Sequence, residues 1–149
     1  MSWIGKLGDT LQDEAVAASM AADCTTLMDQ QVAAKGGISG MALKATYGVV
    51  KGVGADYIPA AIQRLLPDAI AALEPLWQEG LQAGDPVAHL TQNCDRTADT
   101  ILSVTDARIE RARNGLICSS YGKLRKSVKT DIVAAVPGLA QIIGKHATA

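Results

Sequence analysis

Four carboxylates in the second half of the chain lie at the spacing of one helical face. Asp95, Asp99, Asp106 and Glu110 are separated by 4, 7 and 4 residues. On a helix this places all four within about 60° of one another. Such a row could hold a metal ion or take part in acid–base chemistry. A di-iron bundle site requires Glu-x-x-His pairs, however, and the sequence has none. We therefore expect a solvated acidic face that meets lysines or arginines, with no metal and no other cofactor.

A basic cluster overlaps the end of this acidic row and extends beyond it. It holds half of the 14 lysines and arginines of the chain: Arg108, Arg111, Arg113, Lys123, Arg125, Lys126 and Lys129. Tyr121 lies among them and could stack on a planar ligand. Nucleic acid or another anion could bind such a cluster, but the net charge of the chain is −1 and one aromatic ring is too few for a stacking platform. We expect the basic cluster to pair with the acidic row of another copy, which makes nucleic acid the weaker alternative.

Arg108 is the cation whose position is most informative. On a helix over 86–113 it falls inside the apolar sector that contains Leu90 and Ile101. An unpaired buried charge is costly, so this side chain must form an ion pair or extend to solvent. We expect an internal salt bridge to Glu74 or Asp68. Anchoring of an anionic ligand is the alternative.

Catalytic patterns are missing from the sequence. His89 and His146 are isolated, and the three cysteines contain no C-x-x-C pair. There is also no G-x-S-x-G, no P-loop and no dinucleotide-binding glycine pattern. We therefore expect a protein that is not an enzyme.

The stretch Ile38–Val53 is predicted to be a helix that is apolar nearly all round. One side carries Leu43, Tyr47 and Val50, the other carries Ala42, Ala45, Val49 and Gly52, and Lys44 and Lys51 mark a narrow polar strip. A helix of this kind is typical of the middle of a packed domain, with both faces buried. Gly48 and Gly52 have the spacing of a close helix crossing, which we interpret as tight internal packing. The candidate contacts for a ligand or partner on this helix are Lys44, Tyr47 and Lys51.

The other helices are predicted from caps, glycines and prolines. Thr10 and Asp13 resemble a capping box for a helix that ends near Lys35. The further helices are expected over 59–66, over 68–83 with a kink or restart at Pro75, over 86–113 with an Asp85 cap, over 117–124, and over 128–146 with a kink at Pro137. No stretch alternates with period two.

The expected architecture is therefore an all-α, compact bundle of about six to seven helices, several of them kinked by proline. At 149 residues the chain is long enough for one domain, which we assign to 1–149. Residues 1–9 form an N-terminal arm, and we expect it to dock on its own chain or on a neighbouring copy.

Several runs of residues resemble a small bacterial family of uncharacterised proteins. They are SGMALKATYGVVKG, RLLPDAIAALEPLW, ILSVTDARIERARNG, YGKLRKS and AAVPGLAQII. The resemblance covers roughly Val32 to His146 and brings no activity, cofactor or catalytic residue. Lys126 stands where relatives are expected to carry a proline, which bears on the boundary between the last two predicted helices.

The sequence thus favours a non-catalytic cytoplasmic interaction or scaffold module that self-associates. No apolar run is long enough to span a membrane and Met1–Leu7 lacks the features of a secretory signal. The acidic row of one copy would meet the basic cluster of another. The alternative is a bundle that holds an apolar, lipid-like molecule, with Arg108 or Lys51 at its anionic head. Anion or nucleic-acid binding through the basic cluster is a weaker alternative.

Overall fold

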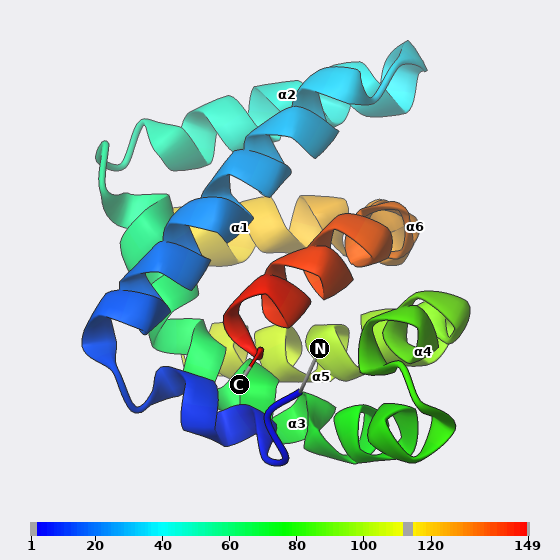
Figure 1. Cartoon of the computed structure of the whole chain (residues 1–149). Coiled ribbons are helices and arrows are strands. Elements are labelled where there is room, and N and C mark those ends of the chain that lie inside the picture. Colours follow the sequence, from blue (N-terminus) through cyan, green and yellow to red (C-terminus); the bar gives the residue numbers. More distant parts are fainter. Residues whose placement is uncertain (1–2, 112–114, 149) are drawn as a thin grey trace.

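The computed structural model describes residues 3–111 and 115–148, apart from the side chain of Lys126. Within these residues every regular element is a helix, which confirms the all-α prediction (Figure 1). In chain order they are η1 (Leu7–Leu11), α1 (Glu14–Ala34), α2 (Gly37–Lys51), α3 (Tyr57–Ala83), α4 (Pro86–Gln92), α5 (Cys94–Glu110) and α6 (Gly115–His146). None of these described helices combines the length and the apolar character needed to cross a membrane.

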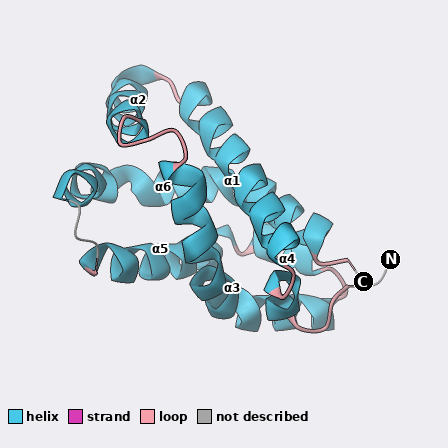
Figure 2. Cartoon of the chain, turned by 90° about the vertical axis from the view of Figure 1, so that its left-hand side faces the viewer, coloured by secondary structure: helices cyan, strands magenta, loops and turns pink. Residues whose placement is uncertain are grey.

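The helix α3 lies at the centre of the packing. Figure 2 shows α1, α4 and α5 lying against it. Its buried apolar residues are Ile58, Leu66, Ile70, Leu73, Leu76 and Trp77. All of these except Ile58 join one core with Leu7 of η1, Met20 of α1, Leu90 of α4 and Ile143 of α6. Burial of a side chain of this size contributes about 1.5–3 kcal/mol, so this core is the main source of stability.

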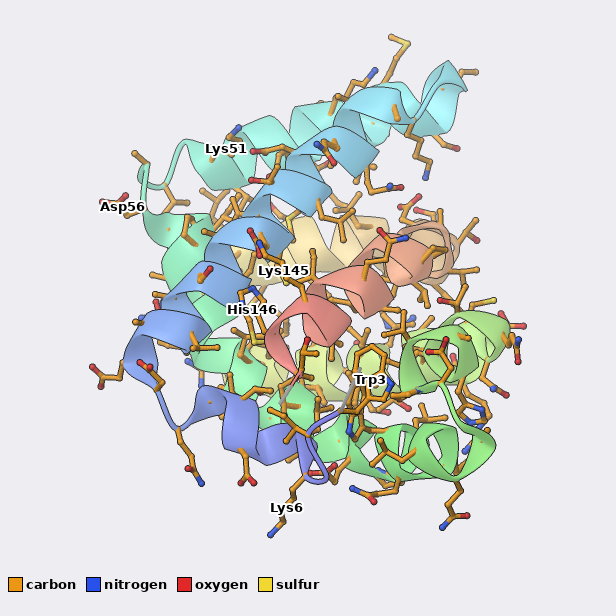
Figure 3. The ribbon with its side chains drawn as sticks, in the orientation of Figure 1. Trp3, Lys6, Lys51, Asp56, Lys145 and His146 are labelled. Carbon is orange, nitrogen blue, oxygen red and sulfur yellow. The ribbon has the colours of Figure 1, made fainter. Side chains whose placement is uncertain are left out.

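The two ends of the described chain are joined to each other and to α3. The backbone N–H of Ile4 donates to the carbonyl of Ala147 at 2.7 Å, and Trp77 Nε1 donates to the carbonyl of Ile4 at 3.0 Å. The rings of Trp3 and Trp77 meet edge to face with centroids 5.8 Å apart. Figure 3 shows Trp3 beside the end of α6 and α4. The described part of the predicted N-terminal arm therefore docks on its own chain.

The proline breaks expected in the middle of the chain do not occur. Pro67 and Pro75 both lie inside the continuous helix α3. Both are exposed, so each missing N–H lies on the solvent side, where a helix can curve without losing its packed face. The prediction of separate helices was wrong because it ignored the core that holds the opposite side of α3.

The predicted long helix over 86–113 is instead two helices. Asp85 caps the first as expected, because its Oδ1 accepts from Ala88 N at 3.1 Å. The break comes at Asn93, whose backbone leaves the helical region and whose side-chain amide donates to the carbonyl of His89 at 2.9 Å. Within the expected apolar stripe Leu90 and Ala98 are fully buried, and its last member, Ala112, lies outside the described residues.

The boundaries of the last helix and of α1 also differ from the prediction. A single helix, α6, replaces the pair over 117–124 and 128–146, and Pro137 lies inside it. Figure 1 shows its ribbon changing direction between its pale orange start and its red end, so that it serves as two arms. At the other end of the chain, Asp13 rather than Thr10 caps α1, through a 2.9 Å bond from Ala15 N. Thr10 is buried in η1, where its hydroxyl donates to Leu7 O.

Candidate interaction surface

The helix α2 is covered on one side only, which corrects the expectation that both of its faces are buried in the middle of the domain. Its buried residues are Gly40 and Leu43. A β-carbon at Gly40 would lie 2.3 Å from the carbonyl oxygen of Lys35, so only glycine permits this approach to the end of α1. In Figure 1, α2 lies at the outer edge of the bundle above α1 and α6.

Two of the three candidate residues of α2 fasten it to α1. Tyr47 donates its hydroxyl proton to Asp29 Oδ1 at 2.5 Å, and Lys51 Nζ lies 3.4 Å from the same oxygen. Lys51 also lies 5.2 Å from the centre of the Tyr47 ring, as a cation–π contact. Burial and the Asp29 hydrogen bond both raise the pKa of Tyr47. These two side chains therefore have a structural role, whereas Lys44 is exposed.

The opposite side of α2 presents large apolar side chains to solvent. Ile38 is 87% exposed, Met41 is 71% exposed and Val49 is 47% exposed. Ala42, Ala45 and Gly52 are exposed beside them. We call the set Ile38, Met41, Ala42, Ala45, Val49 and Gly52 the outer face of α2. The sequence identified most of these residues as apolar and helical, but a periodic pattern does not say which of two apolar sides the rest of the chain covers.

A shallow hollow continues the outer face of α2 toward the start of α6. It measures about 160 Å³ and its lining includes Ala45, Val49, Leu116 and Lys123. Leu116 is 50% exposed there. The apolar surface therefore extends over two elements, with one of the predicted basic residues at its edge.

The basic cluster and the acidic row meet within the same chain, not between copies. Arg125 grips Asp106 through Nε and Nη2, at 2.9 and 3.0 Å, and Lys129 lies 3.1 Å from Asp99. Tyr121 donates to Asp106 Oδ1 at 2.5 Å, so its hydroxyl is engaged and its ring is half-buried. This corrects the expected match in trans, because α6 folds back along α5 and brings the two charge sets together.

The other predicted cations do not form one site in the described part of the chain. Arg108 is exposed in the last turn of α5, not buried with Glu74 or Asp68 as expected. Its place at a helix C-terminus is favourable without an acidic partner, and Glu74 instead accepts from the backbone of Leu7. Arg111 Nε reaches the carbonyl of Ala107 at 3.4 Å. Arg113 and the Lys126 side chain lie outside what the structure describes.

The acidic row does not gather into a metal centre. Across residues 3–111 and 115–148, no three His, Cys, Asp or Glu side chains lie close enough to hold a metal ion. Asp99 and Asp106 face lysine and arginine, while Asp95 and Glu110 are exposed. Burial raises the pKa of the Cys24 thiol to about 11, which keeps it protonated and unreactive at neutral pH.

A second hollow lies between α1 and the start of α3. It measures about 400 Å³, is open to solvent, and is lined mostly by small residues, among them Ala18, Ala22, Pro59 and Ala60, with Asp56 also in the lining. Neither Arg108 nor Lys51, the expected anchors for an anionic head, is part of this lining.

Sequence reasoning missed two acidic residues that organise the surface. Asp29 receives both Tyr47 and Lys51, and Glu79 receives Arg96 at 2.9 Å through both oxygens and His89 at 3.1 Å. Their partners are 17–22 and 10 residues away, on other helices. No local spacing could therefore have revealed these groups.

Comparison with protein families gives one result. The chain matches the family of unknown function DUF6918 over residues 7–147, and it belongs to that family. Searches of curated proteins and of solved structures gave no significant match. The family carries no activity to transfer, so the functional argument depends on the surface described above.

Proposed function

We propose that this protein is a non-catalytic interaction module that self-associates. The observation that carries the proposal is the outer face of α2, where Ile38, Met41 and Val49 stand in solvent on one side of a well-anchored helix. Single exposed apolar residues are ordinary, but a contiguous rimmed patch marks a surface that another molecule covers. The helix is held by Tyr47 and Lys51, so the patch is presented on a rigid element.

The contact between copies is expected to be apolar rather than ionic. Asp99 and Asp106 are already neutralised by Lys129 and Arg125 of the same chain. An apolar contact persists or strengthens as salt is added, whereas an ionic one is screened. Salt dependence therefore separates the present proposal from the trans pairing of charges expected from the sequence.

Sedimentation velocity over a range of concentrations tests the proposal. We expect the weight-average mass to rise from 15.5 kDa toward 31 kDa, twice the chain mass, and to do so equally well at high salt. The double variant Ile38→Lys/Met41→Lys should remain at the monomer mass. A matched control, Gln82→Lys/Gln92→Lys, adds the same charge at exposed positions on α3 and α4 and should behave as the wild type. A constant monomer mass for the wild type would refute self-association.

The second candidate function is binding of an apolar small molecule in the hollow between α1 and α3. The alanines and Pro59 of its lining favour an apolar body, and the Asp56 carboxylate favours a neutral or cationic head over an anionic one. Native mass spectrometry of protein purified from its own host tests it. Discrete extra mass that disappears on denaturation would support this function, and a bare chain mass would count against it.

A further inference from the structure

We infer that two copies associate by packing α2 against α2 in antiparallel orientation, with Ala45 at the two-fold axis. The inference rests on the proposed self-association and adds its geometry. It starts from the order of large and small residues along the outer face of α2.

The outer face of α2 is a single stripe with a size gradient. At 100° per residue its six members fall within about 100°, and Gly48 borders them. The two largest and most exposed side chains, Ile38 and Met41, lie in the first turns. Toward the C-terminal end the stripe is lined by Ala45, Gly48 and Gly52, with Val49 as its remaining branched residue. One end of the face is therefore raised and the other is hollowed.

Such a face is complementary to itself when it is reversed. In an antiparallel pair centred on Ala45, residue i of one helix lies opposite residue 90−i of the other, as a two-fold axis requires. Ile38 of each copy then faces Gly52 of the other, and Met41 faces Val49. Ala42 faces Gly48. Large residues thus meet small ones along the whole contact, which is the condition for close packing between helices.

Glycine packing within the chain supports the view that Gly48 is kept open for another molecule. A β-carbon at Gly138 would lie 2.7 Å from Leu27 Cδ1, and one at Gly144 would lie 2.5 Å from Val87 Cγ2. Those glycines let α6 approach α1 and α4. A β-carbon at Gly48 would meet no atom of another element within 4 Å. The close-crossing spacing of Gly48 and Gly52 is therefore not used inside the monomer, in contrast to the expectation from the sequence.

The charges of α2 are compatible with an antiparallel pair. Lys44 and Lys51 lie about 110° and 130° from the centre of the outer face, so both point away from a contact made there. Helix dipoles attract when they are antiparallel and repel when they are parallel. No acidic residue lies in α2, so the contact contains no buried carboxylate that would need a partner.

The size of the contact predicts a reversible dimer. A 15-residue helix is about 22 Å long and about 10 Å wide. That footprint of about 220 Å² per copy is well below the roughly 800 Å² per partner of a stable interface. Even with a contribution from Leu116 beside the outer face, we expect a dissociation constant of micromolar order or weaker.

Cysteine cross-linking tests the geometry directly. Facing Cα atoms of helices packed 8–10 Å apart lie about 5 Å from each other, within the range that a disulfide spans. In a background with Cys24, Cys94 and Cys118 replaced by alanine, Ala45→Cys should form a disulfide-linked dimer under mild oxidation. Ala71→Cys, at an exposed alanine on α3, is the matched control and should remain monomeric.

A second variant keeps the test independent of cysteine chemistry. Gly48→Leu should raise the dissociation constant by about tenfold or more, because the new side chain fills the space that Ala42 of the second copy occupies. It should not harm folding, since leucine is a better helix former than glycine. Gly122→Leu, at an exposed glycine on α6 with open space around it, should leave the dissociation constant unchanged.

The possible results separate this inference from the proposed function. A dimer that cross-links at 45 but not at 71, and that Gly48→Leu weakens, supports both. A dimer that does not cross-link at 45 and is indifferent to Gly48→Leu overturns the antiparallel α2 contact and leaves self-association standing. A protein that stays monomeric at every concentration overturns both.

Discussion

Arg125 holds Asp106 with two parallel hydrogen bonds, from Nε to Oδ1 at 2.9 Å and from Nη2 to Oδ2 at 3.0 Å. Tyr121 donates to Oδ1 of the same carboxylate, and the two side chains together join α6 to α5. Hydrogen bonds from Tyr121 and then from Arg125 lower the pKa of Asp106. The pair explains why segregated charges in the sequence need not signal a second copy.

The first prediction concerns the hydroxyl of Tyr121. It bonds to Asp106 and lies 2.9 Å from Thr105 Oγ1, in a half-buried position. Tyr121→Phe should lower the free energy of unfolding by about 1 kcal/mol, because both partners lose a hydrogen bond. Urea denaturation measures the change. The matched control is Tyr57→Phe, since the Tyr57 hydroxyl has no hydrogen bond to any described residue. Equal effects of the two substitutions would contradict the prediction.

The second prediction concerns the N-terminal arm. Glu74 of α3 accepts from Leu7 N at 2.9 Å and from Gly8 N at 3.2 Å, so it caps η1 from outside. Glu74→Ala leaves these N–H groups without their carboxylate and should lower the free energy of unfolding by about 1–2 kcal/mol. The near-ultraviolet dichroism of the Trp3–Trp77 pair should also weaken. Glu110→Ala, which removes an exposed carboxylate from α5, is the control and should change neither signal. An unchanged tryptophan signal in Glu74→Ala would show that the arm is held by other contacts.

The third prediction is a pH dependence at Glu79. Its hydrogen bond from Arg96, and next that from His89, lowers its pKa from an ordinary 4.5 to about 2. A carboxyl group whose pKa is lower in the folded state stabilises that state above its unfolded pKa. The stabilisation is present above pH 4.5 and is lost as the pH falls toward 2.

Thermal unfolding from neutral pH to pH 2 tests this behaviour. The midpoint of Glu79→Gln should lie below that of the wild type at neutral pH, and the two should converge as Glu79 becomes protonated between pH 4.5 and 2. Glu110→Gln should show no such convergence, because Glu110 makes no ion pair with a described residue. A gap between Glu79→Gln and the wild type that is constant with pH would contradict the assigned role.

The helical character of the chain was predictable because it depends on local periodicity and on caps such as Asp85. The break at Asn93 was not, since it depends on a side-chain amide that captures a carbonyl of the preceding turn. The continuity of α3 through Pro67 depends on a core contributed by other helices. Local sequence carries no information about that core.

The surface was harder to predict than the fold for a related reason. The pattern of α2 shows two apolar sides, but the rest of the chain covers the side of Leu43 and leaves that of Ile38 in solvent. The pairing of Asp106 with Arg125 depends on α6 folding back along α5. The acidic row and the basic cluster were correctly identified as complementary, and only the tertiary fold decides that they meet within one chain.

The fourth prediction concerns the crossing of α3 and α4 at Gly80. A β-carbon there would lie 2.4 Å from Pro86 Cα and 3.0 Å from His89 Cβ. Since the first of these is a backbone atom, the clash cannot be relieved by a rotamer change, and α4 must move. Gly80→Ala should lower the free energy of unfolding by about 1–3 kcal/mol. Gly122→Ala, on α6 with open space around it, should instead raise it by up to about 1 kcal/mol, because alanine is the better helix former. Urea denaturation at a concentration where the protein is monomeric measures both, and an unchanged slope confirms that the same structure is unfolding. If Gly80→Ala were as stable as Gly122→Ala, the close approach of α4 to α3 would be wrong.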